Sequence, residues 1–191
     1  YDDLDIACNA LYVAAIAHDV VGNYAEAFEL RLRILESARI RKMSRIESIC
    51  LCTIGLQYER RERYELATEA YEKALTLTEV LDISEIAMYR NNVAAAYTKQ
   101  GQSRRGIALA TQALAECPSD NFRTQSYIYH TLGLAYAKEG DYAAAVQNYQ
   151  HALILHDHTG NHLGEDAKVE VLIDLAELHL QHQQSGLAHE L

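Results

Sequence analysis

Proline, tryptophan and long apolar runs are what this sequence lacks. It has one Pro, no Trp and nine scattered Gly in 191 residues. Flexible linkers are rich in Gly, Ser or Pro, so neither a linker nor a second domain is expected. No apolar run approaches the roughly 18 residues that cross a membrane, and no signal peptide is visible. Because the chain starts at Tyr1 rather than Met, we expect it to be a segment of a longer protein.

Cysteine is also scarce, with four residues at Cys8, Cys50, Cys52 and Cys117. Cys50 and Cys52 lie two apart on a predicted helix and point to different faces, so they cannot bind one metal ion together. For the first three we expect buried, reduced thiols rather than a disulfide framework. Reduced thiols fit a cytoplasmic location.

Basic residues are absent from the first thirty positions and sparse after position 105 in a chain whose net charge is −10. Positions 1–30 hold no Lys or Arg and six acids, and positions 106–191 hold three basic residues and eleven acids, whereas positions 31–63 hold nine basic residues. Direct nucleic-acid binding needs a wider basic surface than this, so it is not expected. The basic stretch is interpreted as an exposed turn, or alternatively as a surface for an acidic partner segment.

What the sequence does contain is a pattern that recurs about every forty residues. The copy at 129–153 shows it best, and its positions are Tyr129, Leu132, Gly133, Tyr136, Gly140, Tyr142, Ala145, Tyr149 and Ala152. Looser copies occur at 11–35, 51–75 and 90–118, and a last one begins at Leu172. Repeats of this length are typical of stacked helix pairs, which usually form binding surfaces. We therefore predict an all-α fold.

The spacing within each copy has a physical reason. Large and small residues fall three or four apart, so they share one helix face. The small residues, such as Gly133, allow two helices to approach closely, and residues such as Tyr149 fill the space around that contact. Gly140 suits the left-handed residue that ends a helix, and Asp141 suits the N-cap of the next helix.

These residues resemble the tetratricopeptide repeat family over essentially the whole chain. Tyr129 stands where the family often has Trp, and Arg31 stands where an aromatic residue is expected. The near-forty spacing resembles the longer subgroup found in kinesin light chains and bacterial regulatory proteins. The resemblance implies a right-handed superhelix of stacked antiparallel helix pairs in a single domain, 1–191. Its repeats are expected at about 4–40, 44–82, 84–120 and 122–160, with a truncated repeat at 165–191.

The resemblance also implies a binding function rather than an enzymatic one, with no cofactor and with a protein or peptide as partner. In this family the first helix of each pair lines the concave groove. The candidate peptide-binding residues are Asn9, Tyr12, Ile16, Met88, Asn91, Asn92, Tyr127 and His130. Apolar contacts are expected from Tyr12, Ile16, Met88 and Tyr127, and the two amides are expected to fix the direction of the peptide.

Asn92 is the most informative of these residues. Asn is a poor residue for the middle of a helix, and related repeat proteins hold a peptide backbone with an Asn at this frame position. The alternative is that the amide bonds a neighbouring helix or water. The groove does not resemble the carboxylate-clamp type of chaperone-binding members, so an acidic C-terminal tail is not favoured as the ligand.

Histidine is concentrated late in the chain, since eight of the nine lie between His130 and His189. The cluster His156, His158 and His162 could in principle bind a metal, but no Cys lies nearby and surface histidines are the expected interpretation. No catalytic constellation and no phosphate-binding loop are found. The chain is therefore not expected to be an enzyme or to hold a metal.

Two other functions stay open at this stage. The first is self-association: the truncated repeat exposes an apolar face at Leu172, Leu175 and Leu178 that a second copy could cover, giving a homodimer. The second is a sensory domain that binds a ligand and controls an output domain elsewhere in the parent protein. The favoured prediction is a peptide-binding module of a larger signalling or regulatory protein, of bacterial type.

Overall fold

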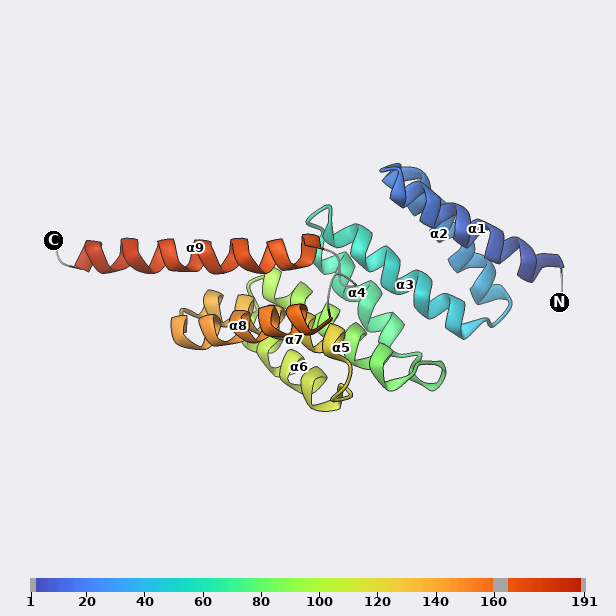
Figure 1. The fold of residues 1–191 in the computed structure, drawn as a ribbon. Helices are drawn as coiled ribbons and strands as arrows, with labels where there is room; N and C mark the ends of the chain where they lie inside the picture. The colour runs from blue at the N-terminus through green and yellow to red at the C-terminus, as the bar shows by residue number, and fades with distance from the viewer. Residues whose placement is uncertain (1–2, 160–164, 190–191) are drawn as a thin grey trace. The chain divides into compact units, whose positions relative to one another are not determined.

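The computed structural model describes residues 3–159 and 165–189, and every regular element among them is a helix (Figure 1). In chain order they are α1 (Asp3–Val20), α2 (Tyr24–Ile40), α3 (Ser44–Glu59), α4 (Tyr64–Leu75), the 3₁₀ helix η1 (Thr78–Val80), α5 (Ile83–Lys99), α6 (Ser103–Glu116), α7 (Phe122–Glu139), α8 (Tyr142–Thr159) and α9 (Glu165–His189). This confirms the predicted all-α fold.

The contacts group the chain into two compact units, Tyr1–Asp82 and Ile83–Leu191. The first contains the helix pairs α1/α2 and α3/α4, and the second contains α5/α6, α7/α8 and α9. The repeat boundaries expected from the sequence stay predictions. The single domain and the right-handed superhelix depend on how the two units are placed, and they stay predictions.

The turn at Gly140 has the geometry that its sequence predicts. Gly140 closes α7 with φ +82°, in the left-handed region. The Asp141 side chain then accepts a 3.0 Å hydrogen bond from the backbone N–H of Ala144, which caps α8. The equivalent turn of the second repeat has Glu62 at φ +57°, a conformation that disfavours a residue with a Cβ. Similar turns thus form with or without glycine.

The close helix contact predicted around Gly133 is present, and it occurs twice. A Cβ on Gly133 would lie 2.5 Å from Cδ1 of Tyr149, and a Cβ on Gly55 would lie 2.5 Å from Cε1 of Tyr71. Both tyrosine side chains are almost completely buried. Each ring therefore packs directly on the backbone of the first helix of its pair. In both repeats, glycine is the residue that makes this contact possible.

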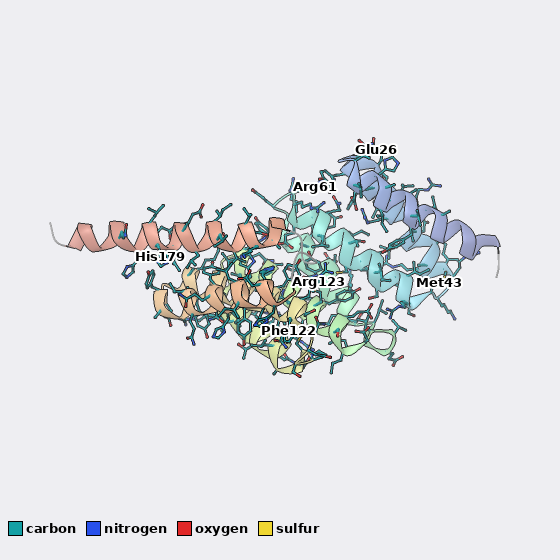
Figure 2. The ribbon with its side chains drawn as sticks, viewed as in Figure 1. Glu26, Met43, Arg61, Phe122, Arg123 and His179 are labelled. Atoms are coloured by element: carbon teal, nitrogen blue, oxygen red, sulfur yellow. The ribbon has the colours of Figure 1, made fainter. Side chains whose placement is uncertain are left out.

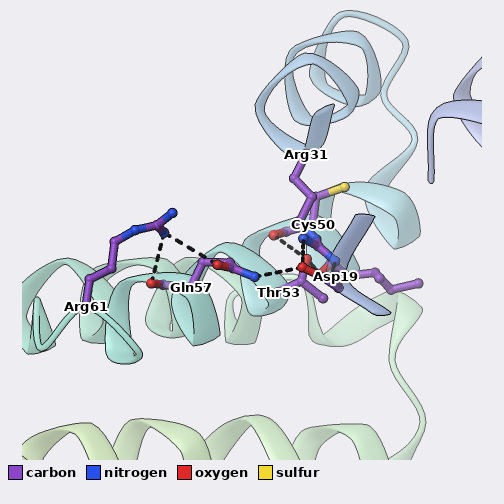
Figure 3. A network of polar contacts seen from close by, with 7 residues as sticks. Asp19, Arg31, Cys50, Thr53, Gln57 and Arg61 are labelled. Atoms are coloured by element: carbon purple, nitrogen blue, oxygen red, sulfur yellow. Dashed lines mark hydrogen bonds and ion pairs between the residues drawn. The ribbon is translucent and has the colours of Figure 1, made fainter. Parts of the chain in front are cut away.

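The first repeat replaces this tyrosine with Arg31, and Figure 3 shows how the charge is accommodated. Arg31 is 3% exposed and forms a two-point ion pair with Asp19 of α1, with 3.2 Å between Nη1 and Oδ1. Gln57 of α3 donates a 3.0 Å hydrogen bond to the same carboxylate. In the second repeat the corresponding positions are Tyr71 and Glu59, whose hydroxyl and carboxylate are 2.8 Å apart. The ion pair thus occupies the place of a tyrosine–glutamate hydrogen bond.

The last helix differs from the sequence-based expectation. A helix pair was expected to begin in the truncated repeat, but α9 is one helix of 25 residues. Its Val171 and Leu178 are buried in a cluster with Ala145, Tyr149 and Ala152 of α8, and Leu175 packs against that cluster. The apolar face predicted for self-association is therefore wrong for Leu175 and Leu178, because these side chains pack within their own unit.

Candidate functional site

The candidate site in the second unit lies on α5 and α7, the first helices of two successive pairs, which pack directly against each other. Four positions on each helix are spaced by four, three and four residues, so they share one helix face. We call this surface the first-helix face, and its residues are Met88, Asn92, Ala95 and Lys99 on α5 and Tyr127, Thr131, Leu134 and Lys138 on α7. All of them except Thr131, which is 7% exposed, are at least partly open to solvent.

The first-helix face is regular, because each position on α5 recurs 39 residues later on α7. Met88 and Tyr127 place large apolar side chains at one end. Asn92 and Thr131 place polar groups in the middle, and a cation closes the other end of each row at Lys99 and Lys138. Such a surface presents the same sequence of chemical groups twice, side by side.

Asn91 occupies a less open position than the sequence suggested. Its side chain is 4% exposed, and its carboxamide oxygen finds no hydrogen-bond partner among the residues that the structure describes. A buried amide oxygen without a partner costs stability. Asn92, one residue later, is only partly buried and reaches the first-helix face.

His130, the next candidate, is partly buried between two helices. Its Nε2 lies 2.7 Å from Oδ2 of Asp174 on α9, and its ring centroid lies 5.9 Å from that of Tyr149. In this structure His130 therefore links α7 to α9.

The candidate residues on α1 belong to the other compact unit. Ile16 is 43% exposed and Tyr12 is partly buried, whereas the Asn9 side chain lies outside the described part of the chain. The structure thus brings Met88, Asn91, Asn92, Tyr127 and His130 into one unit and places Tyr12 and Ile16 in the other.

Beyond the eight candidates, helical spacing in the sequence also places Lys99, Thr131 and Lys138 in the groove, but sequence reasoning missed two members of the first-helix face, Ala95 and Leu134. Both lie in the frame position of Leu56, which is 43% exposed on α3. The 39-residue spacing from Leu56 to Ala95 and from Ala95 to Leu134 is the sequence feature that identifies both positions.

The late histidines mostly contact aromatic rings. His151 stacks on Tyr129 with 5.1 Å between ring centroids, and His182 stacks on Tyr142 at 3.9 Å. His179 projects from α9 towards α8, where its Nδ1 lies 2.6 Å from the Tyr142 hydroxyl (Figure 2). Two of the contacts to α9 therefore depend on the ring of Tyr142.

His156 corrects the expectation that the late histidines are surface residues. It is only 5% exposed, and its ring meets that of Tyr127 edge-on with 6.3 Å between centroids. Burial lowers the pKa of His156, and the nearby His130 and Lys168 lower it further. His158 is exposed, and His162 lies outside the described residues. Among the described residues, no three His, Cys, Asp or Glu are grouped so that they could hold a metal ion.

Two family profiles for the tetratricopeptide repeat match the sequence, at residues 50–80 and 126–158. These ranges cover most of α3/α4 and of α7/α8, which are the pairs with the glycine–tyrosine contact. The chain is a tetratricopeptide repeat protein. Its repeats at α1/α2 and α5/α6 keep the helix pair but depart from the tyrosine, with Arg31 and Ala110 at that position.

Solved structures share the fold of this tetratricopeptide repeat protein at low sequence identity. BtubC (BKLC) from P. vanneervenii is 20% identical with a TM-score of 0.69, covering 88% of this chain and 70% of that one. A putative kinesin light chain with nearly identical TPR-like repeats from Podosopora anserina is 18% identical with a TM-score of 0.65, covering 95% and 90%. MamA from Desulfovibrio magneticus RS-1 is 19% identical with a TM-score of 0.57, covering 93% and 96%. No curated protein matches the sequence.

Among the described residues, no helix combines the length and the apolar character needed to cross a bilayer. The helices gain their stability from the packing of their buried faces within the two units.

Proposed function

We propose that this protein is a binding module that holds an extended segment of a partner protein on the first-helix face. The observation that carries the proposal is the 39-residue recurrence of apolar, polar and cationic positions on two first helices that pack together. An extended peptide presents a regular row of backbone amides and side chains. A surface that repeats the same classes of group can therefore meet residues about three apart along such a peptide, because packed helices lie about 10 Å apart and an extended chain rises about 3.3 Å per residue.

The chemistry of the first-helix face suggests how the segment would bind. Met88 and Tyr127 would contact apolar side chains, since thioether and aromatic groups adapt well to varied partners. The Asn92 amide offers both a donor and an acceptor to a peptide backbone. We place the protein in the cytoplasm and in a larger signalling or regulatory protein, because reduced buried cysteines and repeat modules are common in that setting.

The test uses peptides selected from a random linear library against the whole chain, followed by affinity measurements with variants. Tyr127→Ala and Asn92→Ala should each weaken a selected peptide by about tenfold, the effect of losing roughly 1.4 kcal/mol of binding free energy. Asn148→Ala is the matched control, because its amide donates a 2.8 Å hydrogen bond to the Ala144 carbonyl of its own helix α8. Thermal unfolding shows that each variant is folded.

The result that contradicts the proposal is clear. Peptides that bind Tyr127→Ala and Asn92→Ala as tightly as the native chain do not use the first-helix face. Failure to select any peptide that binds the folded chain would have the same consequence.

A further inference from the structure

Two arginines that directly follow α3 lie over aromatic rings of α2 in the first unit. The guanidinium carbon of Arg60 is 5.1 Å from the centre of the Tyr24 ring, and that of Arg61 is 5.0 Å from the centre of the Phe28 ring. Tyr58 supports Phe28 from α3, with 5.4 Å between the two ring centres. A cation that already rests on an aromatic face loses little further freedom when it binds a ligand. The two rings therefore fix two positive groups at the surface.

Arg61 is held from a second side as well. Its Nη1 donates a 3.1 Å hydrogen bond to the backbone carbonyl of Gln57, and the Gln57 amide donates a 3.0 Å bond to the carboxylate of Asp19 (Figure 3). A guanidinium group has five N–H donors in a planar fork, so the exposed Arg61 keeps several of them for a ligand. Arg63, which is also exposed, adds a third cation in the turn between α3 and α4.

None of these three cations forms an ion pair with a carboxylate within residues 3–159 and 165–189. Other members of the basic stretch at positions 31–63 are already neutralised, because Arg31 pairs with Asp19 and Arg39 pairs with Glu47. The positive charge that is open to a ligand is thus gathered beside the two rings of α2. We call this surface the arginine–aromatic patch, and its residues are Tyr24, Phe28, Arg60, Arg61 and Arg63.

The spacing of the two rings determines which anion fits the patch. Tyr24 and Phe28 are four residues apart on α2, so the guanidinium groups over them are separated by about one helical turn, or roughly 6 Å along the helix. In an extended chain, side chains two residues apart project to the same side at about 6.6 Å from each other. Two acidic residues separated by one other residue can therefore each meet one guanidinium fork, which binds a carboxylate at two points. Directly adjacent acidic residues project to opposite sides.

The acids around the patch limit the length of such a ligand. Glu59 accepts a hydrogen bond from the Tyr71 hydroxyl, and Glu62 and Glu65 are exposed beside Arg63. A nucleic acid carries a negative charge at every nucleotide, so it would meet these glutamates as well as the arginines. Like charges at short range oppose binding. A short acidic segment of a protein meets only the cations.

We propose that the arginine–aromatic patch binds an extended acidic segment of a partner protein, in which two Asp or Glu side chains are separated by one residue. The patch belongs to the first unit and the first-helix face belongs to the second, so either proposal can fail without the other. Contacts between charged groups at an exposed surface are screened by salt, so binding should be weak and should strengthen as the ionic strength falls.

Fluorescence anisotropy with labelled peptides, measured on the whole chain at low salt, tests the proposal. An eight-residue peptide of alternating Glu and Ser should bind, and the same peptide with Gln in place of Glu should not. A third peptide has the same composition, but its glutamates stand in adjacent pairs separated by two serines, so no two of them are two residues apart. It should bind at least threefold more weakly than the alternating peptide.

Variants of the patch locate the binding. Arg60→Gln and Arg61→Gln should each weaken the alternating peptide by about tenfold, because each removes one two-point contact. Arg61→Lys should weaken it severalfold, since an ammonium group cannot bind a carboxylate at two points. Arg33→Gln is the matched control: Arg33 is exposed on α2, nine residues from Tyr24 and so on the opposite side of that helix. It should change the affinity less than twofold.

Thermal unfolding verifies that each variant is folded. Arg60→Gln removes no hydrogen bond within the described residues, so it decides the test if the loss of the Arg61 bond to Gln57 unfolds Arg61→Gln. Absence of binding by the native chain would overturn the proposal, and so would equal affinity for the alternating and paired peptides. An equal loss in Arg33→Gln and Arg60→Gln would do the same. A single-stranded oligonucleotide of equal charge that binds as tightly would show that the surface selects charge alone, which also contradicts the proposal.

Discussion

Replacing Gly133 with Ala tests whether the tyrosine ring of Tyr149 really rests on the α7 backbone. The added Cβ would lie 2.5 Å from Tyr149 Cδ1 and 2.7 Å from its Cε1, distances at which something must move. Tyr149 is 1% exposed, so its ring has no open space to move into. Overpacking of this kind costs about 1–3 kcal/mol, while Ala in place of Gly in a helix gains about 1 kcal/mol. We expect a net loss of about 1 kcal/mol.

The assay is urea unfolding followed by far-ultraviolet circular dichroism, with the free energy of unfolding taken at constant slope. The same substitution is then made in a Tyr149→Ala background, where the ring is absent. There only the helix propensity remains, so Gly133→Ala should stabilise by about 1 kcal/mol. The coupling between the two sites is thus expected to be about 2 kcal/mol. If Gly133→Ala stabilised both backgrounds equally, the close contact would not exist, and the reasoning about small residues in this fold would fail.

Two further predictions concern charged groups inside the units. Asp19→Ala should lower the free energy of unfolding by about 3 kcal/mol, because it leaves the buried Arg31 guanidinium without its carboxylate. The triple change Asp19→Glu, Arg31→Tyr and Ala15→Gly, which copies Glu59, Tyr71 and Gly55, should recover most of the loss. Equal stability of Asp19→Ala and the native chain in urea would argue against the buried pair. Because the pKa of His156 is lowered in the folded state, the unfolded chain binds its proton first as the pH falls. The free energy of unfolding should therefore decrease below about pH 6.5 and keep decreasing until the lower pKa of the folded state is passed. In thermal unfolding, His156→Leu should lose less stability than the native chain between pH 7 and pH 5, and an equal loss would contradict this assignment.

The sequence predicted the helix pairs and their turns because those features depend on residues close together in the chain. Gly140 and Asp141 act within one turn. Gly133 and Tyr149 are only sixteen residues apart and recur as Gly55 and Tyr71. Periodicity exposes contacts of this kind directly, since each copy repeats the same local solution.

The sequence did not predict the contacts between helices that lie outside the repeated pattern. The ring of His156 meets that of Tyr127, which lies on the other helix of the same repeat. The linkage of His130 to Asp174 spans 44 residues and two repeats. The placement of the two units, on which the continuity of the groove with Tyr12 and Ile16 depends, likewise has no local signal.

Two positions that contact each other within a repeat change together from one repeat to the next. One position is in the last turn of the first helix and the other is in the middle of the second helix. They hold Asp19 and Arg31 in the first repeat, and Glu59 and Tyr71 in the second. In the third repeat the tyrosine is replaced by Ala110, and the close approach moves to Gly106, where an added Cβ would lie 2.0 Å from the Thr98 hydroxyl. A change at one of these positions removes the partner of the other, because in the first two repeats the two side chains bond to each other.

The two rows of the first-helix face are constrained to different degrees within their repeats. Met88 and Tyr127 differ in shape and polarity although they occupy equivalent positions, and so do Asn92 and Thr131. The Tyr127 ring meets that of His156 on the second helix of its own pair, and Thr131 is only 7% exposed, whereas Met88 and Asn92 are partly open to solvent. Differences at the open positions of this face should therefore report on the partner. A ligand that fits the α5 row should fit the α7 row less well, and moving Met88 and Asn92 into positions 127 and 131 should shift the preference of a selected peptide without altering the fold.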